Sequence, residues 1–396
     1  MKKLLIITVL LSGCGGGGES TVSPPISTST IPETIKTYQW QLPKGYPTPK
    51  IPDDNPMTEE KVDLGRFLFY DRRVSVNQST SCGTCHEQRL AFTDGKKTAT
   101  GALGDAHPRN SMSLTNVAYN SAFNWANPML KTLHQQALVP LFNEFPVELG
   151  WSDHEKQILD ILRGDPIYKE KFAKAFPNQD DPFTTGNVTR AIASFVETLI
   201  SGNSPYDKQL YQNQPTALSE SAKRGMELFF SERLECFHCH GGFNFTQSTN
   251  HTQTAFVELE FHNNGLYNIG GTGEYPEGGR GLWELTTLKE DMGRFRAPTL
   301  KNIELTAPYM HDGSINTLEE VMDHYSRGGR KIETGAFAGD GALNPFKSEL
   351  MIGFVLSNQE REDVINFLKS LTDWEFICDE RFSDPFYNIP KHESCH

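Results

Sequence analysis

Positive charge is scarce in this 396-residue sequence. It has 37 Lys and Arg residues against 50 Asp and Glu residues, which gives a formal net charge of −13. Phosphate backbones and anionic lipid surfaces would repel such a protein. The charge therefore argues against nucleic-acid binding and against broad electrostatic attachment to a membrane.

Long hydrophobic runs are also lacking. The apolar stretch at residues 4–11 follows two lysines and is too short to span a bilayer. A basic segment followed by a short apolar one is typical of an export signal. This one ends in Leu-Ser-Gly-Cys14, which resembles a bacterial lipoprotein cleavage box. We therefore expect residues 1–13 to be a signal peptide and Cys14 to carry the lipid of the mature chain.

The next segment has few residues that could build a core. Residues 14–37 are rich in Gly, Ser, Thr and Pro, so we expect a flexible tether. The lipid on Cys14 would be the only attachment to a membrane, and Gly15 after it favours the outer membrane. A periplasmic lipoprotein is therefore expected.

Glycine and proline are abundant, with 33 and 23 residues. Their spacing has no period, which excludes a collagen-like fibre. They predict long ordered loops between short elements and disfavour a compact helical bundle.

Cysteine is scarce, but four of the seven cysteines form two short motifs. The motifs are Cys82-Gly-Thr-Cys85-His86 and Cys236-Phe-His-Cys239-His240. In the C-x-x-C-H pattern, two thioethers anchor the vinyl groups of a haem and the adjacent His ligates the iron. Two such motifs in an exported chain predict two covalently bound haem c groups rather than a zinc site or a redox-active thiol pair.

The segments around these motifs form an internal repeat. Before each motif the chain carries the pattern Gly-x-x-Leu-Phe, at residues 65–69 and 225–229. After each motif it carries similar segments, at residues 113–117 and 299–303. A duplication of this extent predicts two similar domains. A capping box at residues 357–360 predicts an amphipathic helix at the end of the second.

The predicted fold is therefore mainly α, with two cytochrome c-like haem domains related by internal duplication and with long loops. We expect the N-terminal domain at residues 38–212, the C-terminal domain at residues 213–375 and a tail at residues 376–396. Cys378 and Cys395 lie in this tail, and export favours a disulfide between them.

The sixth ligand of each haem iron decides between electron transfer and oxidant chemistry. A capping box at residues 317–320 predicts a helix. Its apolar face would be formed by Leu318, Val321, Met322 and Tyr325. Tyr325 should therefore face the second haem, although the spacing is equally that of a core tyrosine. Met310, Met322 and His311 are rival ligands.

At these motifs the chain resembles the bacterial di-haem cytochrome c peroxidases and their MauG-type relatives, over about residues 50–375. Besides the two haem motifs, the resemblance rests on Pro108-Arg109-Asn110, Trp125, Pro146-Val147-Glu148 and Ala307-Pro-Tyr-Met-His-Asp-Gly-Ser314. It implies a peroxidase-type oxidoreductase with two haem c groups that acts on hydrogen peroxide.

The resemblance also implies how each iron is ligated. The family's sixth ligand to the second haem lies fourteen residues after the histidine of the Pro-Tyr-x-His-Asp-Gly segment, as Met in peroxidases and Tyr in the MauG type. Here that position is Tyr325, which implies iron held by His240 and Tyr325. Peroxidases block the first haem with a loop histidine, and Ala102 stands at that position. The first haem, on His86, should be open and peroxide-reactive, with His107 as an alternative blocking ligand.

The family's distal pocket is matched by Gln136, Pro140 and Glu148. In that role, Glu148 would take a proton from hydrogen peroxide and return it to the leaving water. Glu144 is the fallback for this role.

The region between the haems is matched by a further set of residues. Trp125 stands where the family places a tryptophan between the haems, and an indole can relay single electrons. Asn110, Thr306 and Pro308 match the oxygen ligands of an inter-haem calcium ion.

Residues 124–150 resemble most closely the MbnH-like subgroup, whose enzymes oxidise a tryptophan of a small secreted copper-binding protein to kynurenine. The leading hypothesis is a peroxide-dependent di-haem oxidoreductase that forms a high-valent iron state. It would oxidise a residue, such as tryptophan, of an exported partner protein by long-range electron transfer. The alternative is a di-haem cytochrome c peroxidase that reduces hydrogen peroxide to water with electrons from a small redox protein.

The two motifs generate a direct prediction about cofactor loading. Cys82, Cys85, Cys236 and Cys239 should bind two haems through thioethers. Chain produced in a host with cytochrome c maturation should have the mass of the polypeptide plus two haems, and it should stain for haem after denaturation. A mass without both additions would contradict the assignment.

Overall fold

The computed structural model describes residues 36–387 and 392–395. The predicted signal peptide, Cys14 and nearly all of the predicted tether lie outside the described residues. None of the helices within them is long and apolar enough to cross a membrane. The described chain is mainly helical, as predicted, and its short strands β1 (Lys331–Ile332) and β2 (Gly339–Asp340) form one antiparallel pair.

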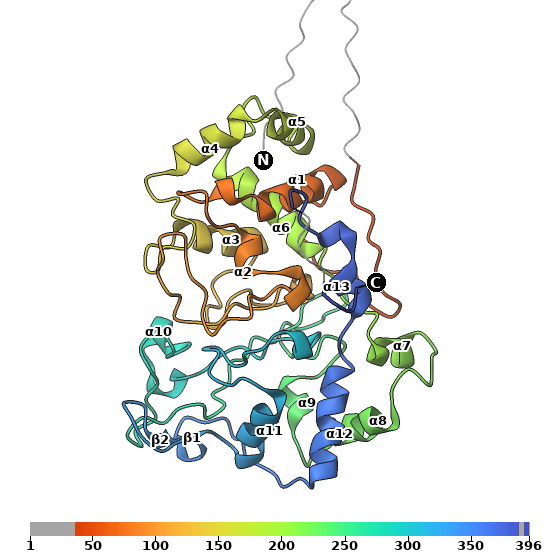
Figure 1. Ribbon diagram of the computed structural model, residues 1–396, viewed down its shortest axis with the longest axis vertical. Coiled ribbons are helices and arrows are strands. Elements are labelled where there is room, and N and C mark those ends of the chain that lie inside the picture. Colours follow the sequence, from red (N-terminus) through yellow and green to blue (C-terminus); the bar gives the residue numbers. More distant parts are fainter. Residues whose placement is uncertain (1–35, 388–391, 396) are drawn as a thin grey trace, which may run out of the picture. The chain divides into compact units, whose positions relative to one another are not determined.

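The first half of the chain builds one hydrophobic core. Its helices are α1 (Glu59–Tyr70), α2 (Cys82–Cys85), α3 (Leu133–Phe142), α4 (Glu155–Gly164), α5 (Pro166–Ala175) and α6 (Thr185–Glu197). Helices α1 and α3 both pack on α6. In Figure 1 these helices gather in the upper part of the ribbon.

The second half builds a separate core. Its helices are α7 (Pro205–Tyr211), α8 (Glu220–Phe229), α9 (Cys236–Cys239), α10 (Trp283–Thr286), α11 (Leu318–Arg327) and α12 (Asn358–Lys369). The predicted capping boxes begin α11, at Thr317 and Glu320, and α12, at Ser357 and Glu360. Helix α12 packs along α8.

Both cores use the same close helix crossing, at equivalent glycines of the sequence repeat. A Cβ on Gly65 would lie 1.9 Å from the carbonyl oxygen of Ala191 in α6. A Cβ on Gly225 would lie 1.9 Å from the carbonyl oxygen of Asp363 in α12. No larger side chain fits at either position without a backbone shift, so the repeated glycine is required by packing. The duplication therefore extends from sequence to helix packing.

A second equivalence lies after each haem motif. Asn116 and Asn302 both adopt left-handed backbone angles, with φ of 56° and 60°, which Asn tolerates better than most residues. The side-chain oxygen of Asn116 accepts from the backbone N–H of Ser201 at 2.7 Å. That of Asn302 accepts from the backbone N–H of Asp373, also at 2.7 Å. Each asparagine thus ties its loop to the chain just beyond the last helix of its core.

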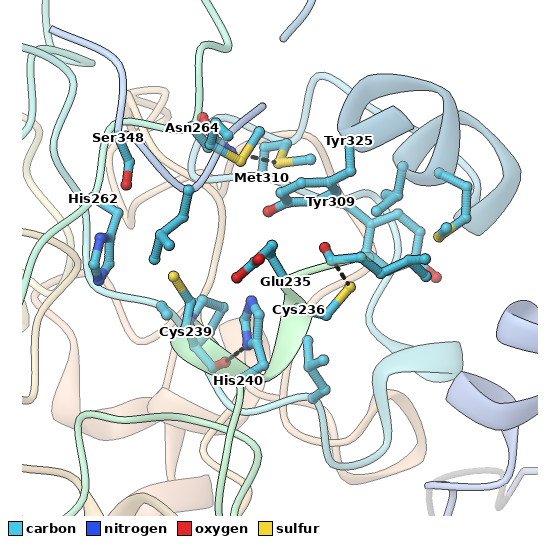
Figure 2. Close-up of a pocket in the computed structure, with 18 of the residues that line it drawn as sticks. Glu235, Cys236, Cys239, His240, His262, Asn264, Tyr309, Met310, Tyr325 and Ser348 are labelled. Carbon is cyan, nitrogen blue, oxygen red and sulfur yellow. Dashed lines mark hydrogen bonds between the residues drawn. The ribbon is translucent and has the colours of Figure 1, made fainter. Parts of the chain in front are cut away.

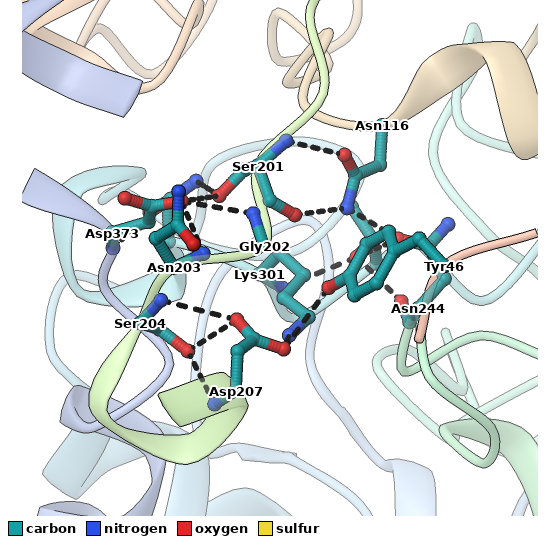
Figure 3. A network of polar contacts seen from close by, with 12 residues as sticks. Tyr46, Asn116, Ser201, Gly202, Asn203, Ser204, Asp207, Asn244, Lys301 and Asp373 are labelled. Carbon is teal, nitrogen blue, oxygen red and sulfur yellow. Dashed lines mark hydrogen bonds and ion pairs between the residues drawn. The ribbon is translucent and has the colours of Figure 1, made fainter. Parts of the chain in front are cut away.

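The two cores are joined by a buried polar network (Figure 3). Asn116 Nδ2 donates to the side-chain oxygen of Asn244 at 3.0 Å, and Asn302 Nδ2 donates to Ser201 Oγ at 3.1 Å. Both bonds connect residues from different halves of the chain. The described residues from 36 onwards belong to one compact unit, so the predicted boundary between residues 212 and 213 stays a prediction.

At the centre of this network lies an ion pair between Lys301 and Asp207. Lys301 Nζ lies 2.5 Å from Asp207 Oδ1, and both side chains are fully buried. The carboxylate also accepts from the hydroxyl groups of Tyr46 at 3.0 Å and Ser204 at 2.6 Å. Burial lowers the pKa of Lys301 because it removes water from the ammonium group, and Asp207 opposes this shift.

The predicted tail packs against the first half of the chain. Helix α13 (Trp374–Cys378) contributes Phe376 and Ile377 to the first core. The hydroxyl group of Tyr70 in α1 donates to the carbonyl oxygen of Phe382 at 2.6 Å. The expected disulfide between Cys378 and Cys395 is present. The last segment of the chain is therefore part of the N-terminal core rather than an appendage.

The buried ion pair predicts a large effect of Asp207→Asn on stability. This change leaves the Lys301 ammonium buried without a counter-charge, which costs about 3–5 kcal/mol of unfolding free energy. Denaturant titration should show the loss as a lower unfolding midpoint. The matched control is Asp160→Asn, which removes an exposed partner of Lys156 and should leave the midpoint unchanged. Equal unfolding midpoints for the two variants would contradict the proposed contribution of the Lys301–Asp207 ion pair to stability.

Candidate functional site

The second haem motif opens into a cavity, shown in Figure 2. The single turn of α9 presents Cys236 and Cys239, and His240 caps the turn by donating its backbone N–H to the Cys236 carbonyl oxygen at 3.0 Å. All three residues line the cavity, which encloses about 1470 Å³ up to and including its open mouth. Its lining is mostly apolar, which suits a large flat macrocycle.

His240 is oriented by backbone carbonyl groups. Its Nδ1 lies 3.1 Å from the carbonyl oxygens of both Phe245 and Pro298. Burial lowers the pKa of His240 to about 4, so the ring is neutral at physiological pH. A neutral imidazole that donates from Nδ1 keeps Nε2 as its free ligand atom, which is the usual arrangement of a metal-binding histidine. The residue therefore fits the role of an axial haem ligand.

Tyr325 enters the same cavity from α11, on the side opposite His240 (Figure 2). Burial raises the pKa of its hydroxyl group to about 12, and a hydrogen bond with Asn264 partly offsets the shift. The rivals Met310, Met322 and His311 line the cavity too. Met310 Sδ accepts from Asn264 Nδ2 at 3.4 Å. The structure thus brings all four candidate ligands to one cavity.

The first haem motif lines a smaller cavity, which encloses about 770 Å³. Cys82 and His86 lie in its wall, and Gln136 and Pro140 of α3 join them as the resemblance implied. His86 Nδ1 lies 2.8 Å from the carbonyl oxygen of Phe92. This repeats the arrangement of His240, so the first cavity fits a haem with the same kind of proximal ligand.

Glu148 lies beside the first cavity but is not among its lining residues. Its carboxyl group is close enough to raise the pKa values of the Cys82 and Cys85 thiols electrostatically, after the larger effect of their burial. Burial raises the pKa of Glu148 itself to about 7, opposed by a hydrogen bond with Asn143. Glu144, the fallback, is exposed. A carboxyl group that titrates near neutral pH is suited to move protons in both directions.

The loop that could block the first haem packs against Glu148. The backbone N–H of Ala102 donates to the Glu148 carbonyl oxygen at 2.8 Å. His107 Nε2 lies 3.7 Å from Glu148 Oε1. Neither Ala102 nor His107 lines the first cavity. His107, the alternative blocking ligand of the first haem, therefore lies near the Glu148 carboxyl group and is not part of the lining of the first cavity.

Trp125 lies in the wall of the second cavity. Its indole N–H donates to the carbonyl oxygen of Asn110 at 2.9 Å, and its own carbonyl oxygen accepts from the backbone N–H of Arg296 at 2.9 Å. Arg296 lines both cavities. Trp125 is thus held in the partition between the two cavities.

The three residues matched to a calcium ion come from two segments that meet. The backbone N–H of Asn110 donates to the carbonyl oxygen of His311, which follows Thr306 and Pro308, at 2.8 Å. Asn110 Nδ2 donates to the Lys96 carbonyl oxygen at 2.8 Å, which leaves the amide oxygen to act as a ligand. The calcium site stays a prediction.

Two cavities, each with a C-x-x-C-H turn whose histidine is held by backbone carbonyls, define a di-haem protein of the c type. Residues 59–215 match the family model of di-haem cytochrome c peroxidases. The chain is 32% identical over 380 residues to the methylamine utilization protein MauG of Methylorubrum extorquens, covering 94% of this chain and 96% of the relative. The chain belongs to the family of di-haem cytochrome c peroxidases and MauG proteins.

Two further comparisons agree. Cytochrome-c peroxidase IdrP1 of Pseudomonas sp. (strain SCT) is 32% identical over 347 residues, which cover 82% of this chain and 84% of the relative. A crystal structure of a MauG-like protein associated with microbial copper homeostasis is 46% identical, with a TM-score of 0.86 over 88% of this chain and 100% of that chain. The protein is therefore a peroxide-dependent oxidoreductase with two haem c groups.

Sequence reasoning missed two residues of this site. Asn264 contacts both Tyr325 and Met310, but it lies in a loop without a motif. Arg296 precedes the second copy of the repeated segment at residues 299–303, yet no pattern marks it as buried. Only the packing of distant segments reveals either residue.

The pKa of Glu148 generates a prediction about pH. The ionised carboxylate takes the proton from peroxide, so the rate of reaction with peroxide should rise as the pH increases through about 7. Glu148→Gln should slow this reaction by about 100- to 10,000-fold and remove the rise. Stopped-flow absorbance with the di-haem protein measures both effects.

Glu144→Gln is the matched control and should behave like the wild type. If it instead reproduces the slow rate while Glu148→Gln reacts normally, the proton-transfer role belongs to Glu144.

Proposed function

We propose that this enzyme uses hydrogen peroxide to oxidise a residue, such as tryptophan, of an exported partner protein. The partner would stay outside the first cavity, and its electrons would travel to the peroxide site through the protein. Each peroxide takes up two electrons and two protons and yields two water molecules. The tryptophan that supplies these electrons and protons gains its oxygen atom from a water molecule.

The observation that carries this proposal is the position of Tyr325 opposite His240 in the second cavity. We assign Tyr325 as the sixth ligand of the second haem. A tyrosine there departs from the Met of peroxidases and matches the MauG type. Its anionic oxygen favours oxidised iron more strongly than a neutral thioether would. The second site is thereby suited to drawing electrons from a protein.

The first cavity supplies the peroxide chemistry. When bound, the haems would supply redox-active irons, and the haem held by Cys82, Cys85 and His86 would be the one that reacts with peroxide. Glu148 takes a proton from the inner oxygen of hydrogen peroxide and delivers it to the outer oxygen, which leaves as water. Gln136 and Pro140 line the cavity and limit its size, so a macromolecular substrate cannot enter it.

Trp125 is the proposed connection between the two cavities. It lies in the wall of the second cavity, and Arg296, which lines both, is hydrogen bonded to its backbone. An indole in this partition can pass single electrons. A calcium ion bound by Asn110, Thr306 and Pro308 would stiffen the same region.

The similarity to a MauG-like protein associated with microbial copper homeostasis supports a copper-related partner. We further propose that a lipid on Cys14 and the following tether hold the enzyme at the outer membrane, within reach of exported proteins. The two proposed haem domains span residues 38–212 and 213–375.

The alternative is a di-haem cytochrome c peroxidase that receives electrons from a small redox protein. Relatives such as IdrP1 of Pseudomonas sp. (strain SCT) bear that name, which favours this candidate. The two functions share the peroxide chemistry and differ only in the electron donor.

The deciding experiment mixes the di-haem enzyme, hydrogen peroxide and the exported protein encoded next to its gene. We expect mass spectrometry to find oxygen added to a tryptophan of the partner. Trp125→Phe should reduce this modification far more than it slows the first reaction with peroxide, because it interrupts only electron transfer between the two haem sites. An unmodified partner together with rapid oxidation of reduced cytochrome c would favour the alternative.

A Tyr325→Phe variant serves as a second test. It should keep both haems attached, lose the low-spin signal of the second haem in the resting EPR spectrum and fail to modify the partner. An unchanged spectrum would point to Met310, Met322 or His311 as the ligand.

A further inference from the structure

Arg296 occupies an unusual place, in the partition between the two cavities. Its side chain lines both of them, although only 4% of the residue is exposed. Its backbone N–H donates to the Trp125 carbonyl oxygen at 2.9 Å, which ties it to a segment of the first half of the chain. A cation thus lies at the one point that the two cofactor sites share.

No carboxylate in the described part of the chain lies within ion-pair distance of this guanidinium group. Its nearest polar contacts are long: Ala297 O at 3.4 Å, Asn124 O at 3.5 Å and Met112 Sδ at 3.7 Å. Burial lowers the pKa of Arg296 to about 10, so the group is still charged at neutral pH. A buried charge without a counter-charge is strongly unfavourable. The guanidinium group therefore needs a counter-anion, and the polypeptide does not supply one.

A second buried donor points to the same missing group. His311 is 5% exposed and lines the second cavity, and its Nε2 has no hydrogen-bond partner within the described residues. Its ring stacks on Phe295, the neighbour of Arg296 in sequence, with the ring centres 3.7 Å apart. Two groups that lack a suitable partner in the polypeptide, one cationic and one polar, thus line the second cavity.

We propose that Arg296 and His311 form a carboxylate-binding site in the partition, and that its ligands are the propionate groups of the bound haems. Each haem carries two such carboxylates, so each cavity receives anions when it is filled. Arg296 serves as the counter-ion shared by both haems, because it borders both cavities. His311 lines the second cavity and not the first, so its Nε2 would donate to the second haem only.

This site couples the two haems electrostatically. Reduction of either iron adds one negative charge, which the shared guanidinium group stabilises through a protein interior of low dielectric constant. Loss of that cation should make both haems harder to reduce. The inference concerns haem potentials and holds whichever electron donor the enzyme uses.

The test is a spectroelectrochemical titration of the di-haem protein with the Arg296→Met variant. We expect both midpoint potentials to shift downwards, while the haem content stays at two per chain because the thioethers hold the cofactors. Arg296→Lys keeps the charge and should show smaller shifts. The matched control is Arg294→Met, whose side chain is 39% exposed and lies 3.9 Å from Asp291, and it should leave both potentials unchanged. Unchanged potentials in Arg296→Met would overturn the proposal.

A second measurement covers the case in which Arg296→Met does not accumulate. Resonance Raman spectra report hydrogen bonding to haem propionates through their bending modes. His311→Phe should shift the propionate mode of the second haem and leave that of the first unchanged. Identical propionate modes in His311→Phe and the wild type would contradict the role of His311 and, with it, the proposed site.

Discussion

The fully buried ion pair between Lys301 and Asp207 lies at the centre of the polar network that joins the two cores. Lys301 stands in the repeated segment after the second haem motif, and Asp207 stands in α7, the first helix of the second core. Because both side chains are fully buried, neither can lose its partner without leaving a charge far from water. Hydrogen bonds of Tyr46 and Ser204 surround this pair, and those of the two equivalent asparagines connect the two halves of the chain (Figure 3).

The two halves share a scaffold but differ in what faces each cavity. Equivalent glycines and asparagines set the same helix crossing and the same loop tie, and both motif histidines are oriented by backbone carbonyls. The differences lie in the elements added to that scaffold. Helix α11 brings Tyr325 to the second cavity, whereas α3 brings Gln136 to the first and the following loop places Glu148 beside it. A duplicated fold thus carries two sites with different chemistry.

Much of this arrangement could be predicted from local sequence. Helix α11 begins at the predicted capping box, because a cap is a contact between residues three apart. The repeat indicated two similar cores, and the structure shows why glycine recurs in it. The position of the predicted tail could not be predicted in this way. Its Phe376 and Ile377 pack into the first core, against residues far away in the sequence, and no local sequence pattern indicates such a contact.

The sequence by itself determined the two haem attachment motifs, the repeat and the starts of α11 and α12, since each depends on local residue patterns. Tertiary structure decided which groups surround each cavity and how far each is removed from water. Glu148 and Glu144 look alike in sequence, but folding partly buries Glu148, which raises its pKa to about 7, and leaves the Glu144 side chain exposed. The sequence does not distinguish Arg296 from an ordinary surface cation, yet folding buries it between two cavities. Its burial and its lack of a counter-charge depend on how segments distant in the chain pack together.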